Sequence, residues 1–96
     1  MKPWGLCWWH MQAWKSIFEL NRNEMYSKFV FEIADWTLNY QLSSGAFLVD
    51  YSKAGPGFHT ACVLEGISDA WSLAIELGDK ERSLTYKVSW GNGMKL

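Results

Sequence analysis

The sequence predicts a small all-α protein made of two antiparallel helical hairpins, about four helices in total. Apolar residues recur at helical spacing over roughly residues 8–40 and again over 59–90. A Gly- and Ser-rich stretch without periodicity separates these parts. A similar helix–turn–helix pattern is found on both sides of it. We therefore expect one domain over residues 1–96, with a first hairpin at 1–40, a Gly-rich loop at 41–58 and a second hairpin at 59–96.

Composition excludes several classes of protein. Hydrophobic residues make up 49% of the 96 residues and charged residues 20%, which is ordinary for a globular domain and not for a disordered segment. Nine Lys and Arg balance ten Asp and Glu without any cluster of like charge, which argues against a nucleic-acid binder. The unusual feature is seven Trp residues, which raises the aromatic share to 17%.

Motifs for cofactors, metals and membranes are not found in the sequence. Cys7 and Cys62 are too few for a disulfide framework and lack the spacing of a zinc site, so we interpret them as small apolar side chains. No apolar run approaches the 18–20 or so residues that cross a bilayer. The first nine residues do not resemble a signal peptide. We expect no cofactor and no metal, no contact with membrane or nucleic acid, and a cytoplasmic location by default.

The first hairpin consists of helices at about residues 8–20 and 24–40. The break between them contains Asn21 and Asn23, either of which could cap the second helix. In this second helix we expect one apolar face and one wet face, as in an outer helix. The apolar stripe comprises Met25, Phe29, Ile33, Trp36 and Tyr40, and the polar stripe comprises Lys28, Glu32, Asp35 and Asn39.

The connection over residues 41–58 carries turn residues at both ends and a short segment, 46–51, that could be extended. The third helix, about residues 59–77, is apolar on nearly all sides and is therefore expected in the interior. Small residues recur along one face of it, which favours a close approach by a neighbouring helix. These residues are Cys62, Gly66, Ala70, Ala74 and Gly78.

The fourth segment, about residues 80–90, gives conflicting signals. Gly78 should end the third helix and Asp79 should cap a fourth, but Leu84, Tyr86, Val88 and Trp90 alternate as in a strand. A repeat at an offset of 57 favours a helix. Its matches are Ala13-Trp14 with Ala70-Trp71, Glu19-Leu20 with Glu76-Leu77, and Glu24 with Glu81.

Several segments together resemble a known group. They are residues 14–26 (WKSIFELNRNEMY), 31–36 (FEIADW), 45–47 (GAF), 57–61 (GFHTA) and 64–70 (LEGISDA). The arrangement is similar to consecutive hairpins of the (α/α)6 toroids of carbohydrate-active enzymes, in particular the N-acylglucosamine 2-epimerase and six-hairpin glycosidase group. A complete toroid has six hairpins and this chain supplies two. The resemblance thus implies a fragment or small member of that group, sugar epimerase-like or glycoside hydrolase-like, without activity of its own.

The resemblance also points to candidate site residues. Toroid enzymes place cavity-lining histidines where His59 stands, at the start of an inner helix, and His10 occupies a comparable position. A structural interpretation, capping or packing, competes at both. Asp50 is a third catalytic candidate, and Tyr51 beside it could contact substrate, because loops carry function on a rigid scaffold. Both could equally be ordinary loop polarity.

Tryptophans could supply a sugar-stacking platform, because indole faces suit pyranose rings. Trp14, Trp36 and Trp71 fall on core stripes, which leaves Trp4, Trp8 and Trp9 as the substrate-binding candidates. Covering a neighbouring hairpin is their alternative role. Two carboxylates, Glu65 and Asp69, share a helical stripe and are interpreted as a solvated face.

Two functional hypotheses follow. The first is the carbohydrate-active toroid piece, with a carbohydrate ligand. The second is an all-helical protein-interaction module. Under the first, the missing hairpins leave an exposed apolar patch, so we expect self-association or cover by remaining hairpins of a longer chain.

Overall fold

The computed structural model describes residues 7–47 and 56–95. They form four helices: α1 (Cys7–Asn21), α2 (Glu24–Leu38), α3 (Pro56–Glu76) and α4 (Lys80–Gly93). Over these ranges there is no strand, only an isolated bridge between Gln41 and Phe47. The predicted all-α class is confirmed, including a helix in the segment whose pattern alternates like a strand.

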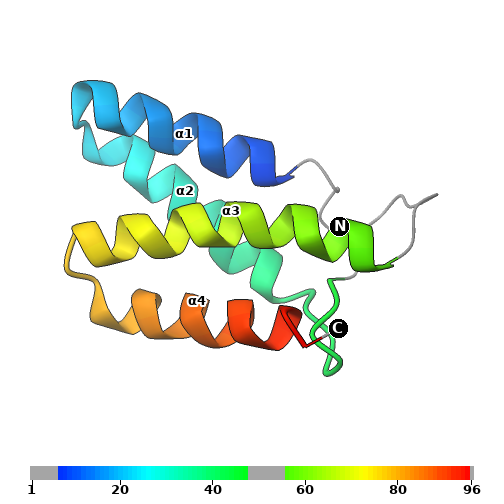
Figure 1. Ribbon diagram of the computed structural model, residues 1–96. Helices are drawn as coiled ribbons and strands as arrows, with labels where there is room; N and C mark the ends of the chain where they lie inside the picture. The colour runs from blue at the N-terminus through cyan, green and yellow to red at the C-terminus, as the bar shows by residue number, and fades with distance from the viewer. Residues whose placement is uncertain (1–6, 48–55, 96) are drawn as a thin grey trace.

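The helices pack as two hairpins, α1–α2 (hairpin 1) and α3–α4 (hairpin 2). In Figure 1, α1, α3 and α4 follow one another from top to bottom, and α2 passes behind them. α3 contacts each of the other three helices and is the central element, as its all-round apolar pattern predicts. None of the helices in the described part is long and apolar enough to cross a membrane.

Both hairpin turns use the same local device. A residue with positive φ ends the first helix (Arg22 at 59°, Gly78 at 73°), and an Asx residue caps the second. Asn23 Oδ1 accepts a hydrogen bond from the Met25 amide at 3.0 Å, and Asp79 Oδ1 accepts one from the Arg82 amide at 3.0 Å. Asn23 is therefore the cap of the second helix, and Asn21 is not.

The two hairpins correspond at an offset of 56 residues, and the predicted offset of 57 is wrong. The three turn positions Arg22/Gly78, Asn23/Asp79 and Glu24/Lys80 are each 56 apart. In this register the buried residues Met11, Phe18 and Val30 correspond to the buried residues Ile67, Ala74 and Tyr86. An offset of 57 would instead match buried Phe18 with Ile75, which is 61% exposed. The sequence identities at 57 therefore do not mark equivalent positions.

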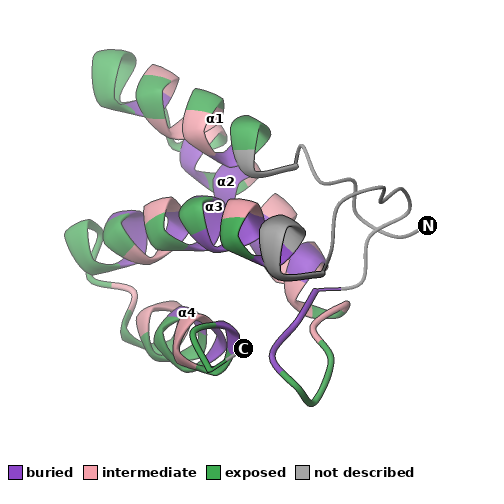
Figure 2. Ribbon diagram, turned by 45° about the vertical axis from the view of Figure 1, so that its right-hand side comes forward, coloured by how far each residue is buried: buried purple, intermediate pink, exposed green. Residues whose placement is uncertain are grey.

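The buried face of α2 is not the predicted aromatic stripe. Its buried residues are Ser27, Val30, Phe31, Ala34 and Thr37 (Figure 2). The predicted stripe lies to one side, with Met25 exposed and Ile33 only half-buried. Small side chains at the centre let α2 approach the bundle closely, while the larger rings cover its flank. Asp35, predicted on the wet face, turns toward α4 instead.

α3 begins at Pro56, three residues before the predicted start at His59. Proline suits the first helical turn, because the amide hydrogen it lacks would have no helical partner there. The small-residue face is buried at Gly66, Ala70 and Ala74, whereas Gly78 lies in the exposed turn.

The described part of the 41–58 connection is held against hairpin 2. Gln41 Nε2 donates to the Ser89 carbonyl at 2.9 Å, and Ser89 Oγ donates to Gln41 Oε1 at 2.7 Å. The Phe47 amide donates to Thr60 Oγ1 at 3.1 Å, which places this end of the connection on α3. Of the predicted extended segment 46–51, positions 48–51 lie outside the described residues.

Candidate functional site

A shallow groove of about 630 Å³ lies on the outer face of α3. α1 contributes Gln12 to one side and α4 contributes Trp90 to the other, while α3 supplies Glu65, Ser68 and Asp69 from its floor. The groove exists because α1 and α4 flank α3 while α2 covers only the opposite side (Figure 1). It combines two carboxylates, an amide, hydroxyls and one indole.

Asp69 has the most perturbed environment in this groove. Its Oδ1 lies 3.9 Å from Lys15 Nζ, which is itself 3.1 Å from Glu19 Oε1. Its Oδ2 is buried and has no hydrogen-bond partner. Burial raises the pKa of Asp69 above its ordinary value, and this effect is opposed by Lys15 and by a hydrogen bond from Gln12. The expectation of a solvated carboxylate is therefore wrong for Asp69, although it is correct for Glu65, which is exposed.

The groove is better arranged for binding than for hydrolysis. Glycoside hydrolysis uses two carboxyl groups on opposite sides of the scissile bond. Glu65 and Asp69 come from consecutive turns of one helix, so they face a ligand from the same side. Among the described residues, no group of three or more His, Cys, Asp or Glu side chains could hold a metal ion.

The candidate residues from the sequence are not brought together. His10 and Trp9 lie exposed near the start of α1, outside the groove lining. His59 belongs to α3 and Trp8 to α1, but their side chains are outside the description. The remaining candidates, Trp4, Asp50 and Tyr51, lie outside the described residues.

Gln12, Asp69 and Trp90 were missed as groove residues. Their proximity depends on how α1 and α4 settle against α3, and no local spacing encodes that. The one available signal was the position of Asp69 directly beside the small-residue face of α3, because a carboxylate next to a helix–helix contact is partly desolvated.

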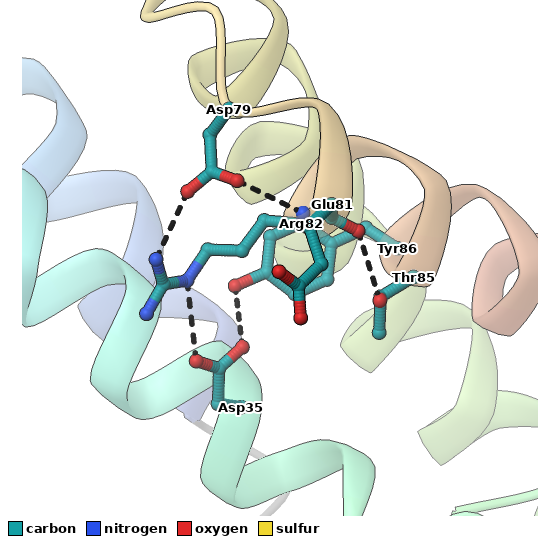
Figure 3. Close-up of polar contacts among 6 residues, drawn as sticks. All are labelled: Asp35, Asp79, Glu81, Arg82, Thr85 and Tyr86. Atoms are coloured by element: carbon teal, nitrogen blue, oxygen red, sulfur yellow. Dashed lines mark hydrogen bonds and ion pairs between the residues drawn. The ribbon is translucent and has the colours of Figure 1, made fainter.

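A second polar cluster joins α2 to α4 (Figure 3). The Arg82 guanidinium lies between two carboxylates, donating to Asp79 Oδ2 at 2.9 Å and to Asp35 Oδ2 at 3.3 Å. Tyr86 Oη donates to the other Asp35 oxygen at 2.6 Å. The guanidinium also lies over the Phe31 ring, 4.8 Å from its centroid. We call Asp35, Asp79, Arg82 and Tyr86 the α2–α4 clamp.

The clamp is electrostatically self-consistent. Hydrogen bonds from Arg82 lower the pKa of Asp79. Burial, together with the hydrogen bond to Asp35, raises the pKa of Tyr86 and keeps its hydroxyl protonated. Because the charges and hydrogen bonds are used within the cluster, we interpret it as a structural tie between the hairpins.

A third feature is the outward face of hairpin 2. Its members are the α3 residues Trp71 and Ile75 and the α4 residues Trp90 and Met94, which we call the hairpin 2 end face. Trp71 and Trp90 contact each other with ring centroids 6.0 Å apart, and Ile75 and Met94 are about 60% exposed. These four side chains are apolar, and the exposed Ser68 and Ser72 lie beside Trp71 and Ile75.

No protein-family model, no curated protein and no solved structure matches this chain. The likeness to carbohydrate-active toroids thus stays a prediction from the sequence.

Proposed function

We propose that this chain is a non-catalytic interaction module, a stack of two helical hairpins that binds helical partners through an apolar end. The observation that carries this proposal is the hairpin 2 end face. Stacked hairpin proteins normally close their terminal units with polar outer surfaces. Here the outer surface of the second unit presents two half-buried indole rings and an exposed isoleucine and methionine.

The polar residues of the fold support the same choice. Arg82 and its carboxylates are engaged in holding α2 to α4, and Lys15 is engaged with Asp69 and Glu19. The groove carboxylates stand on one side only, which disfavours the glycosidase alternative. Large exposed apolar patches on small domains mark interaction surfaces.

An apolar fluorescent dye tests this proposal at low protein concentration. We expect the dye to bind the native protein and to accept excitation energy from Trp71 and Trp90. Ile75→Glu should abolish most of this binding, because it places a charge on the end face one helical turn from Trp71. The matched control is Leu42→Glu, since Leu42 is also exposed (48% against 61%) but lies in the 41–47 connection and outside the four helices. Equal dye binding by the wild type and Ile75→Glu would contradict the proposal.

A polyhydroxylated ligand in the α3 groove is a second candidate function. The indole of Trp90 beside the amide of Gln12 and the carboxylate of Asp69 is a combination that suits sugar rings. Titration of tryptophan fluorescence with a panel of mono- and disaccharides tests it. Saturable quenching that Asp69→Ala removes would support this function, and an unchanged spectrum at high sugar concentration would contradict it.

A further inference from the structure

We propose that the hairpin 2 end face binds the outer face of hairpin 1 of a second copy of this chain, head to tail. The contact between copies has the same geometry as the contact between the two hairpins of one chain. Hairpin 2 of the first copy plays the part of hairpin 1, and hairpin 1 of the second copy plays the part of hairpin 2. The inference rests on the proposed interaction function and names its partner.

Within one chain, the contact between the two hairpins contains charged side chains from both of them. Three ion pairs cross it: Lys15 with Asp69 at 3.9 Å, Arg22 with Glu76 at 3.4 Å, and Asp35 with Arg82 at 3.3 Å. Lys15, Arg22 and Asp35 therefore mark the side of hairpin 1 that contacts hairpin 2. Asp69, Glu76 and Arg82 mark the side of hairpin 2 that contacts hairpin 1.

The 56-residue correspondence transfers both sides to the free ends of the stack. Lys15, Arg22 and Asp35 become Trp71, Gly78 and Gly91 on the outward side of hairpin 2. Asp69, Glu76 and Arg82 become Ala13, Leu20 and Tyr26 on the outward side of hairpin 1. A second copy continuing the stack would place Trp71 against Ala13, Gly78 against Leu20, and Gly91 against Tyr26.

Each of these three pairs combines a large side chain with a small one. In these three pairs no like charges face each other. The contact between copies also differs from the contact between the hairpins of one chain, where the equivalent positions form ion pairs. An apolar contact is what two separate copies require, because burial of apolar surface must offset the lost translational freedom.

The space around these residues supports the pairing. A Cβ atom added at Gly78 or Gly91 would meet no heavy atom within 4 Å, so both positions can receive a side chain from outside. Leu20, the side chain that Gly78 would receive, is 87% exposed in the single chain. Gly91 lies inside α4, where glycine costs about 1 kcal/mol relative to alanine, and no packing within the chain calls for it.

An apolar residue outside the helices provides a matched control for a surface substitution. Leu42 is 48% exposed and belongs to the 41–47 connection, outside the four helices.

A head-to-tail contact leaves one free face at each end of a dimer, so the assembly continues into longer stacks or closes into a ring. We therefore expect the weight-average mass of the wild type in analytical ultracentrifugation to rise beyond that of a dimer with increasing concentration. Leu20→Glu should weaken association about tenfold or more, since it faces Gly78 with a buried charge. Leu42→Glu should leave association unchanged, because Leu42 is exposed and lies outside the four helices.

A charge-pair rescue makes the test specific. The double variant Leu20→Glu with Gly78→Arg recreates the Arg22–Glu76 pair between copies and should associate again. Arginine can adopt the backbone of Gly78, because Arg22 has a similar positive φ in the equivalent turn. Far-ultraviolet circular dichroism of each variant verifies the fold.

The outcomes separate this inference from the proposed function. Dye binding by a wild type that stays monomeric at its highest soluble concentration would overturn the second-copy partner and leave the interaction function standing. Association that resists Leu20→Glu, or that is lost in Leu42→Glu, would overturn the head-to-tail geometry. Equal dye binding by the wild type and Ile75→Glu would overturn the proposed function itself.

Discussion

The environment of several individual residues is set by contacts with residues that are distant in the sequence. Asp69 is a clear case. On its own helix it belongs to a narrow polar stripe, but the approach of α1 places it beside Lys15 and leaves Oδ2 buried without a partner. The groove carboxylate with the strongest perturbation is thus a product of the α1–α3 contact.

Replacing Asp69 should change how stability depends on pH. Burial raises its pKa above the ordinary value of 3.8, so the folded chain holds this proton more tightly than the unfolded chain does. The stabilisation by this proton is fully present below 3.8 and is lost as the pH rises through the raised folded pKa. Asp69→Asn, which stays neutral, should therefore gain stability relative to the wild type as the pH rises through that window.

Thermal unfolding of both proteins over a pH series measures this difference. Glu32→Gln is the control, because Glu32 is exposed on α2 and should show no such trend. A wild type that gains stability over Asp69→Asn with rising pH would mean that the Lys15 ion pair outweighs burial.

Two glycine-to-alanine changes should have opposite effects. Gly45 has φ of 96°, and a Cβ atom there would collide with the Asn92 carbonyl of α4. Gly45→Ala should therefore destabilise by about 1–3 kcal/mol or more. Gly91→Ala should stabilise the monomer by up to about 1 kcal/mol, since its helical site is open. Urea unfolding at low protein concentration compares the two, and equal effects would contradict the assigned backbone at Gly45.

At the scale of elements, α2 shows why an apolar stripe does not always give the buried face. Its aromatic residues form a continuous row, yet the close contacts are made by Val30, Ala34 and Thr37. Trp14 stacks on Tyr26 at 5.7 Å and packs against Phe29 at 5.1 Å, so these rings cover the seam between α1 and α2. Large rings serve at the edge of this contact because a deep position would hold the helices apart.

The α2–α4 clamp should show strong coupling between Asp35 and Tyr86. Tyr86→Phe removes a hydrogen bond to a charged acceptor and should cost about 1.5–3 kcal/mol of unfolding free energy. In an Asp35→Ala background the same change should cost much less, because the partner is already absent. A double-mutant cycle by chemical denaturation measures the difference.

The exposed pair Arg22–Glu76 provides the comparison for this cycle. Because both side chains are about half exposed, this pair should couple by only about 0.2–1 kcal/mol. A clamp coupling no larger than this value would mean that α2 and α4 are held together by apolar packing alone.

For the whole molecule, α3 is the element on which the others depend. It contacts α1, α2 and α4, and it supplies six of the most buried apolar side chains. They are Val63, Leu64, Ile67, Ala70, Leu73 and Ala74. Removal of any neighbouring helix would therefore expose part of the core, which makes both hairpins one cooperative unit.

Hydrogen exchange should reveal this hierarchy. We expect the slowest amide exchange over residues 63–74 of α3, at rates set by global unfolding. The first turn of α1 and the last turn of α4 should exchange faster, because they are nearer the ends of the bundle. Mass spectrometry of exchanged peptides measures these rates, and independent protection of hairpin 1 would contradict a single cooperative unit.

Much of this architecture could be predicted from the sequence because the signals are local. The breaks at Arg22–Asn23 and Gly78–Asp79, and the apolar spacing of α3, depend only on residues a few positions apart. The prediction of a helix at α4, despite its strand-like alternation, is confirmed. The repeat that favoured this helix was placed at an offset of 57 residues, one residue too long. The candidate site was harder, because Gln12, Asp69 and Trp90 come from three helices, and His10 and Trp9 lie outside the groove.

The sequence by itself determined that the chain forms four helices in two hairpins, that Asp79 caps α4, and that α3 lies inside. Local propensity and capping settle such features before any distant contact forms. Only the tertiary structure decided which face of α2 is buried, that the hairpins correspond at 56 residues, and that Asp69 meets Lys15. Those features depend on the rotation and sliding of packed helices, where one residue of register moves a side chain by about 100° around the helix.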